Sequence, residues 1–477
     1  MTAERTLRTL EITGLVLLAL LFAVWPVAHT ISLRDLLLVL VLLLFGYLVW
    51  RARPAMPWRE LVWLSGLYAA LTLWIVVVAL FISEETAWSL GEIRGQWLKG
   101  LFAMLAGGLA ALALARTPGG TTRAIVVVFG VLLAHTLYTD AVTIRGIFEA
   151  WLDPEGRLVP LVRHIGISPD STDYGYLTLL RHEWKDVMLT DGPDKSNLLS
   201  NLLLYLLLAE FFVRFVHHRR LLPFSGTFLF LALAAVLFSL YIERARNGFA
   251  ELIVVLLLLG GLLLHAYRGR LNRRTLGLGI AVLLMLPFAI GYISYKTDPR
   301  WQSLWQTVPI AFDTQSHKAW MDQNKYSMPF LPSGEQVSGS NYLRLARAKV
   351  SLEFVREHPW GMGFGRNIFG HAVKRKYGEN PSHSHSGLID MALGTGIPGV
   401  LLWGAFLASI GYVAGKAYVR ARSYSALLLV LLVTSYSVRM VLDSIIRDHM
   451  LQMFLFLAAF LAVAAVRTPD DKTVPAA

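Results

Sequence analysis

The stretch Leu252-Ile-Val-Val-Leu-Leu-Leu-Leu-Gly-Gly-Leu-Leu-Leu264 contains no charged or hydrogen-bonding side chain. It lies in an apolar run over residues 248–267, which has the length of about 20 residues that a helix needs to cross a bilayer. Backbone groups find no water inside lipid, so only helices and closed barrels span membranes. A continuous apolar run excludes a barrel strand, in which apolar and polar residues alternate. The run therefore predicts a transmembrane helix.

Similar runs recur along nearly the whole chain of 477 residues, of which 55% are hydrophobic and only 16% are charged. The mean hydropathy is +0.54. On length and apolarity we expect about twelve spans, at 12–31, 35–50, 61–83, 97–115, 124–142, 197–213, 223–242, 248–267, 275–294, 387–415, 424–442 and 449–466. The tenth is long enough to include a turn around Gly394 and Gly396. The sequence thus predicts an all-α polytopic membrane protein.

The basic residues of the short loops predict the orientation, because such residues concentrate in cytoplasmic loops. Every second loop is rich in arginine, for example Arg51, Arg53 and Arg59, and the loops between them hold far fewer basic residues. We therefore expect both termini in the cytoplasm. The expected regions are helices 1–9 (1–294) with a smaller outer loop at 143–196, a large outer loop (295–386), helices 10–12 (387–466) and a cytoplasmic tail (467–477).

Composition excludes several kinds of chemistry. The chain has no cysteine, so it has no disulfide, no thiolate nucleophile and no cysteine-ligated metal. The net charge of +12 reflects in part the basic bias of the cytoplasmic loops. We expect membrane lipids as surroundings and no nucleic acid as a partner.

The polar segment Pro381-Ser-His-Ser-His385 ends where the tenth span begins. A histidine at the water edge of a membrane protein can accept or donate a proton near neutral pH. The alternatives are two solvated loop histidines, or a metal site that needs a third and a fourth ligand. We favour a general base at this pair of histidines, and we expect neither a metal nor a cofactor.

Arg244 and Arg246 lie in a short outer loop between two apolar spans. An arginine at a helix end usually extends to the lipid headgroups. Two arginines in a tight outer loop run against the charge bias, which indicates an anionic partner. Arginine is also suited to gripping pyrophosphate with two hydrogen bonds. Arg163, in the loop 143–196, is a further candidate for substrate binding.

Arg344, Arg347 and Lys349 begin an amphipathic run in the large outer loop, with Leu343, Ala346, Val350, Leu352, Phe354 and Val355 at helical spacing. The alternative to substrate binding is a solvated helix face. Gly361-Met-Gly-Phe-Gly365 lacks the Lys-Ser/Thr ending of a phosphate loop, so we expect no nucleotide there. Near the last outer loop, we expect Arg439, Asp443, Arg447 and Asp448 to pair with one another.

Together these motifs resemble those of the O-antigen ligase and O-antigen polymerase superfamily. The signature His-[Asn/Ser/Gln]-x9-Gly-x-x-[Gly/Thr/Tyr] is met by His385, Ser386, Gly396 and Gly399. A Ser-Arg-Gly-type turn is matched loosely by Ala245-Arg246-Asn247-Gly248. A run from an arginine to Pro-x-x-Gly-x-Gly matches Arg344 through Pro359-Trp-Gly-Met-Gly363, with one glycine displaced. Where the family usually has a tryptophan four residues after this arginine, the chain has Ala348.

The resemblance implies a metal-independent, inverting membrane glycosyltransferase of lipopolysaccharide biosynthesis. An O-antigen ligase moves a glycan from undecaprenyl pyrophosphate to a sugar hydroxyl of lipid A–core. The resemblance also implies the inner membrane, an active site on its periplasmic side and periplasmic outer loops. It implies that Arg246 and Arg344 bind the pyrophosphate. The register of the motif selects His385 as the base that takes the proton of the acceptor hydroxyl, with His383 as a neighbour that orients it or contacts substrate.

Two other functions stay open at this stage. An O-antigen polymerase of the same superfamily uses the same donor but a second lipid-linked glycan as acceptor. A polytopic lipid or glycan transporter would need charges at mid-membrane and broken helices in paired repeats. The sequence shows neither clearly, so we favour the ligase.

Overall fold

The computed structural model describes residues 2–152, 188–190, 192–243, 246–268, 272–297, 301 and 303–467. Within these ranges the regular secondary structure is helical, apart from two isolated antiparallel bridges, Val27 with Thr190 and Phe330 with Gln336. The expectation of an all-α polytopic membrane protein is confirmed.

The described helices are α1 (Thr2–Val24), α2 (Ile31–Ala52), α3 (Trp58–Val77), η1 (Val78–Ile82), α4 (Thr86–Glu92), η2 (Ile93–Trp97), α5 (Leu98–Leu114), α6 (Gly120–Leu152), α10 (Pro193–His217), α11 (Gly226–Glu243), α12 (Arg246–Tyr267), α13 (Arg273–Thr297), α15 (Leu304–Phe312), α16 (Gly339–Glu357), α17 (Ile368–Tyr377), α18 (Gly387–Ala421), α19 (Tyr424–Leu442) and α20 (Asp448–Arg467). Among them, 11 helices or helical runs are long and apolar enough to cross a membrane. These coincide with all the expected spans except 275–294. That span lies in α13, which is helical but is not one of the eleven.

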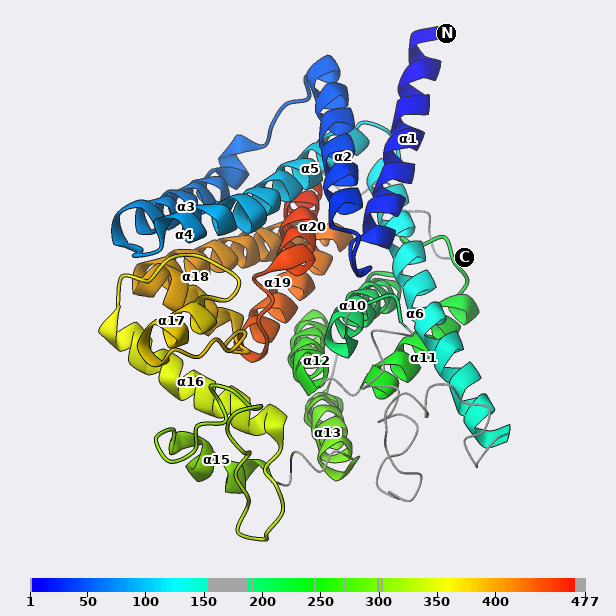
Figure 1. The fold of residues 1–477 in the computed structure, drawn as a ribbon. Helices are drawn as coiled ribbons and strands as arrows, with labels where there is room; N and C mark the ends of the chain where they lie inside the picture. Colours follow the sequence, from blue (N-terminus) through cyan, green and yellow to red (C-terminus); the bar gives the residue numbers. More distant parts are fainter. Residues whose placement is uncertain are drawn as a thin grey trace.

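The most buried span, α20, packs against α5, α18 and α19 in the middle of the bundle (Figure 1). Small residues make the close approach of α5 possible, because Ala103, Ala106, Gly107 and Ala110 are all buried there. A Cβ atom on Gly107 would lie 2.1 Å from the backbone oxygen of Phe456 in α20. Small residues at helix contacts are typical of membrane bundles, where packing and not water exclusion drives association.

Several loops expected on the outer side meet at one end of the bundle, which we call the site end. It comprises the end of α3 and the starts of α12, α18 and α20. One contact that joins them is the bond from Arg366 to Glu92, near the start of the long helical run 86–114. At the opposite, far end lie the start of α3 and the ends of α18 and α20. Which end faces the periplasm stays a prediction.

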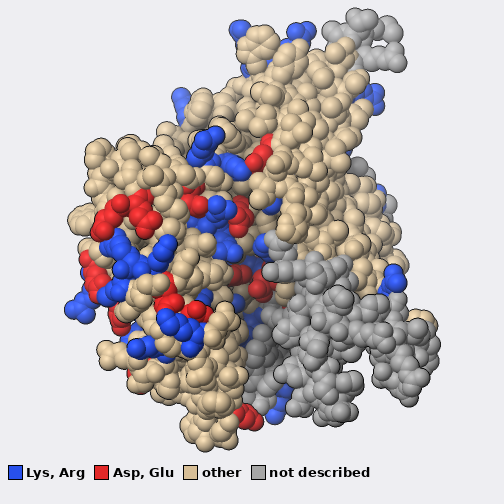
Figure 2. All heavy atoms as spheres, viewed as in Figure 1, with Lys and Arg blue, Asp and Glu red and all other residues tan. Residues whose placement is uncertain are grey.

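The described part of the large outer loop has its own small core at the site end. Buried Trp320, Tyr342, Phe354 and Phe369 are central to it. The expected amphipathic helix is α16, whose buried face includes Ala346 and Val350. Leu352 was predicted on that face but is 62% exposed, because it lies two residues beyond Val350, on the outer side of the helix. Charged side chains gather over this region in Figure 2, and much of the remaining visible surface is uncharged.

Candidate active site

The centre of the candidate site is Arg347. It lies on the buried face of α16, and only 6% of its surface is exposed. Its Nε donates to the carbonyl of Trp320 at 3.1 Å. Its Nη1 donates to the carbonyl of His383 at 3.0 Å and lies 3.4 Å from Nε2 of His385. Burial lowers the pKa of Arg347 to about 10, so the guanidinium keeps its charge at neutral pH. The structure thus brings together Arg347 and His385, two residues that the sequence singled out separately.

The two predicted histidines lie against each other just before α18. Their ring centroids are 4.3 Å apart, at an angle of 67°. Nδ1 of His383 accepts the backbone N–H of His385 at 3.2 Å. His385 has φ 68°, in the left-handed region that a side chain with a Cβ rarely adopts. The bond from His385 to the ring of His383 helps hold this strained backbone, and such strain is frequent at functional sites.

Hydrogen bonds from the start of α18 and from the turn after α19 fix the loop that contains His383 and His385. Ser386 is the N-cap of α18 and accepts the N–H of Ile389. Buried Asp390, in the first turn, accepts the N–H of Ser384 at 3.3 Å and the hydroxyl of Ser444 at 2.6 Å. The N–H of Gly387 donates to the carbonyl of Asp443 at 2.9 Å. The start of α18 and the turn after α19 therefore form one support beneath His385.

Both histidines are held in the neutral form. For His383, burial is the main cause and the nearby charge of Arg447 the next, and together with its other cationic neighbours they lower the pKa to about 2. For His385, burial and the charges of Arg347, Arg344 and Arg447 lower the pKa to about 3. A neutral imidazole has a lone pair free to accept a proton. The arrangement therefore provides a base surrounded by positive charge.

Arg246 and Arg344 link α12 to α16 in a reciprocal way. Arg246 donates to Asn341 at 2.7 Å and to Ser340 at 3.1 Å, and its guanidinium lies 5.2 Å from the ring centroid of Trp301. Arg344 donates to Asn247, next to Arg246, at 3.1 Å and also to the carbonyl of Leu442. Two predicted arginines therefore lie on either side of one helix contact, a turn of α16 away from Arg347.

The motif glycines form a backbone contact with α18. Residues 359–363 run along α18 where Gly396 breaks the helix with φ 68°. The N–H groups of Met362 and Gly363 donate to the carbonyls of residues 393 and 394, and that of Ile397 donates to the carbonyl of residue 359. A Cβ on Gly396 would lie 2.3 Å from the carbonyl carbon of Trp360. The expected turn around Gly394 and Gly396 is confirmed as this kink.

A buried polar network lies between the helices behind the arginines. Glu251 accepts from Arg439 at 2.8 Å, from Ser435 at 2.7 Å and from Tyr205 at 3.1 Å. Arg439 also donates to Asn197 at 3.2 Å. The sequence led us to pair Arg439 with Asp443, and that contact exists at the longer distance of 3.9 Å. Its closer partner, Glu251, lies far away in the sequence, where spacing gave no signal.

Arg447 is a member of the cluster that the sequence interpretation did not assign to the site. It was expected only to pair with its neighbours, and its Nε does lie 3.7 Å from Asp448. Its charge also acts on His383 and His385. Its place in the last outer loop, on the same side as the histidines, was the available signal. Arg163 and Arg244, also predicted to bind substrate, lie outside the described residues.

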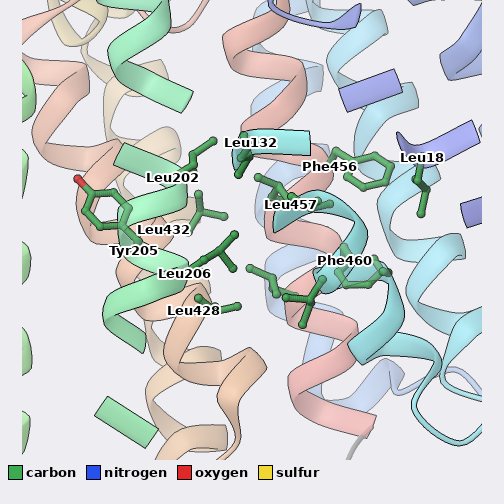
Figure 3. A pocket seen from close by; sticks show the side chains of 14 residues that line it. Leu18, Leu132, Leu202, Tyr205, Leu206, Leu428, Leu432, Phe456, Leu457 and Phe460 are labelled. Atoms are coloured by element: carbon green, nitrogen blue, oxygen red, sulfur yellow. The ribbon is translucent and has the colours of Figure 1, made fainter. Parts of the chain in front are cut away.

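A separate pocket among the helices is lined almost entirely by apolar side chains. Figure 3 shows leucine and phenylalanine side chains from α1, α6, α10, α19 and α20 around it. Tyr205 is the one lining residue with a polar side-chain atom, and its hydroxyl donates to Glu251. The pocket is therefore a poor site for a reaction, and the cluster at the site end remains the candidate.

Comparison with known proteins finds a family match that covers part of the chain. Residues 228–404 match the family described as O-antigen ligase. The comparison with curated proteins gives no match. The matched range runs from α11 into α18 and contains Arg246, Arg344, Arg347, His383 and His385, but not Arg447. The resemblance drawn from the motifs is confirmed for residues 228–404, which are similar to the O-antigen ligase family.

Proposed function

We propose that the protein is an O-antigen ligase that transfers a glycan from undecaprenyl pyrophosphate to a sugar hydroxyl of lipid A–core. The observation that carries the proposal is the contact of Arg347 with His385 at 3.4 Å, within a group of arginines at one end of a membrane bundle. Such a group suits a substrate that combines a lipid tail, a pyrophosphate and a hydroxyl partner.

In the proposed reaction, His385 acts as the general base. The acceptor hydroxyl replaces Arg347 as the partner of Nε2, and its oxygen attacks the anomeric carbon of the donor. The bond from that carbon to the pyrophosphate oxygen breaks, and its electron pair leaves with undecaprenyl pyrophosphate. The hydroxyl proton passes to Nε2 of His385 and then to water. A single displacement of this kind inverts the configuration at the anomeric carbon.

The arginines stabilise the leaving group. Negative charge grows on the pyrophosphate as the bond breaks, and fixed cations in a site of low dielectric lower the energy of that state. Arg246 and Arg344 are the proposed pyrophosphate ligands, and Arg347 and Arg447 add positive charge that acts on both histidines. Arg163 and Arg244 are proposed as further substrate contacts. No metal is needed in this scheme, because the leaving group arrives activated and the arginines supply the positive charge.

His383 is proposed as a residue that positions the base. Its ring accepts the N–H of His385 and so supports the left-handed backbone there. The catalytic side is proposed to face the periplasm of the inner membrane, where both lipid substrates share one leaflet.

The test uses purified protein with a lipid-linked glycan as donor, lipid A–core as acceptor and EDTA in the buffer. A ligase attaches the glycan to lipid A–core, whereas a polymerase joins donor glycans to one another even without lipid A–core. Formation of only the second product would refute the ligase assignment but keep the superfamily chemistry. A requirement for added divalent ions would contradict the metal-free scheme. His358→Ala, at the end of α16, serves as a histidine control outside the cluster.

A further inference from the structure

A second group of cations lies at the far end of the bundle, away from the histidines. There the start of α3, the end of α18 and the end of α20 enclose a groove with a volume of about 960 Å³. This is near the upper end of the range of about 300–1,000 Å³ for small-molecule sites. Arg59, Lys416, Arg420 and Arg467 line the groove, and Glu60 is its one acidic residue.

These cations are not balanced by acidic side chains of the described chain. Lys416 lies 5.9 Å from the ring centroid of Tyr412, and Arg467 donates to the carbonyl of Ala55. Arg59 and Arg420 are exposed and form no ion pair with a described residue. The groove therefore has an excess of positive charge, which indicates an anionic ligand.

A basic bias at one membrane face is common, so the arrangement has to differ from that background. Arg214 at the same end is satisfied internally: it pairs with Glu210 at 2.7 Å and donates to the carbonyls of Leu222 and Phe224. The four groove cations come from three helices, α3, α18 and α20, and converge on one hollow. Convergence on a concave surface, and not the number of charges alone, points to a bound group.

The walls of the groove indicate the rest of the ligand. Leu67, Ala405 and Val413 contribute apolar surface. Trp63 and Tyr412, which are 77% and 68% exposed, flank it. Exposed tryptophan and tyrosine near the ends of transmembrane helices are typical of the headgroup level of a bilayer. A ligand in this place meets cations at one end and apolar helix surface at the other.

We propose that this groove binds an anionic glycerophospholipid from the leaflet away from the candidate active site. Its phosphate lies among Arg59, Lys416 and Arg420, and its hydrocarbon chains lie along α3 and α18. Basic pockets between transmembrane helices are suited to anionic lipid headgroups. This lipid is a bound component and not a substrate, since the groove and the histidines lie at opposite ends of the bundle.

The test measures binding of phosphatidylglycerol and phosphatidylcholine to the purified full-length chain by native mass spectrometry in detergent. The triple variant Arg59→Gln, Lys416→Gln and Arg420→Gln is compared with a control triple at the same end, Arg116→Gln, Arg219→Gln and Arg220→Gln, which lies outside the groove. One cation near an anionic lipid contributes about fivefold in affinity, so the groove triple should bind phosphatidylglycerol about a hundredfold more weakly. The control triple should bind it as the wild type does.

A second variant tests the groove without changing its charge. Ala408→Trp fills the hollow from an exposed position of α18, so it should weaken binding of phosphatidylglycerol and leave the fold intact. Millimolar inorganic phosphate should not compete with the lipid, because it lacks the hydrocarbon chains. Equal affinity for the two lipids, equal losses in the two triples, normal binding by Ala408→Trp or full competition by free phosphate would each overturn the proposal.

Discussion

Nη1 of Arg347 lies 3.4 Å from Nε2 of His385. A guanidinium can only donate, so Nε2 accepts, and the proton of the neutral ring is on Nδ1. The same arginine that lowers the pKa of His385 also occupies the lone pair of its Nε2. In the proposed reaction, an acceptor hydroxyl has to displace this bond before it can lose its proton.

The first prediction concerns the pH dependence of transfer. Burial and three arginines lower the pKa of His385 to about 3, so the base form persists through mildly acidic pH. We expect kcat/KM of the wild type to show no acid limb near the ordinary histidine value of about 6.5. In Arg347→Gln the loss of the positive charge should raise the pKa of His385. The acid limb of the kcat/KM profile should therefore move to higher pH. A limb between pH 6 and 7 in the wild type, unmoved by the substitution, would contradict this role.

The same pKa values predict the sign of a change in stability. Below about pH 6.5 the unfolded histidines bind protons, but the folded ones do not until the pH approaches 3. The unfolded state therefore gains protons first as the pH falls. The free energy of unfolding contributed by His383 and His385 should decrease from pH 6.5 downward, and the double variant to Ala should lose part of this pH dependence in thermal unfolding.

The second prediction separates the two histidines. His385→Ala should reduce kcat by about a hundred- to ten-thousand-fold, which is the usual contribution of a positioned base. His383→Ala should reduce it less, because it only loosens the backbone of His385. Transfer assays of both purified variants, with His358→Ala as control, measure the difference. A dead His383→Ala beside a fully active His385→Ala would assign the base to the other ring.

The third prediction concerns the hydrogen bonds that the guanidinium of Arg246 donates. It donates to Asn341 and Ser340, and a lysine keeps its charge but not its fork of donors. Losing a charged hydrogen bond costs about 1.5–3 kcal/mol, so Arg246→Lys should lower kcat/KM by roughly ten- to a hundredfold. Arg366→Lys is the matched control, because Arg366 also forms a forked contact, with Glu92, on the outer surface. Equal activity of the two variants would remove Arg246 from the site.

The fourth prediction tests the glycine contact. Gly396→Ala places a Cβ against the backbone of residue 360 at a positive φ, so it should destabilise the protein by at least about 1–3 kcal/mol. Gly404→Ala, in the same helix with no atom near the added Cβ, should be neutral or stabilising by up to about 1 kcal/mol. Thermal unfolding in detergent compares them, and similar midpoints would show that the kink tolerates a side chain.

The fifth prediction concerns sidedness, and the absence of cysteine makes it simple to test. Ser333→Cys lies in the large outer loop, and Arg220→Cys in the basic loop between α10 and α11. Both positions are exposed. A membrane-impermeant maleimide added to intact cells stripped of their outer membrane should label Ser333→Cys and not Arg220→Cys. Labelling of both or the reverse pattern would invalidate the predicted orientation.

Hydropathy was sufficient for eleven of the twelve expected spans, because each one is a local property of about 20 residues, whereas the expected span 275–294 is helical but not among the eleven. The kink at Gly396 was also local, since two glycines interrupt an overlong apolar run. Leu352 was placed wrongly because helical spacing alone gives a broad stripe, and only the packing of Tyr342, Ala346 and Val350 selects its centre.

The contacts that hold the site were less accessible to sequence. Arg439 pairs with Glu251 on another helix, and Arg344 donates to Asn247. The sequence spacing of neither pair indicates that the two residues are in contact. His385 and Arg344 were identified because they lie in motifs. Arg447 lies in no motif, and only the fold shows that its charge acts on the histidines.

The backbone bonds between residues 359–363 and the kink of α18 have a mechanical consequence. Main-chain bonds in a tight glycine contact resist sliding, so we expect the outer loop and α18 to stay together. The opposite border of the site differs, because Arg246 and Arg344 join α12 to α16 through long side chains. If bulky lipids reach the site as proposed, we therefore expect them to enter on the α12 side, where side-chain bonds can exchange partners more easily than main-chain bonds.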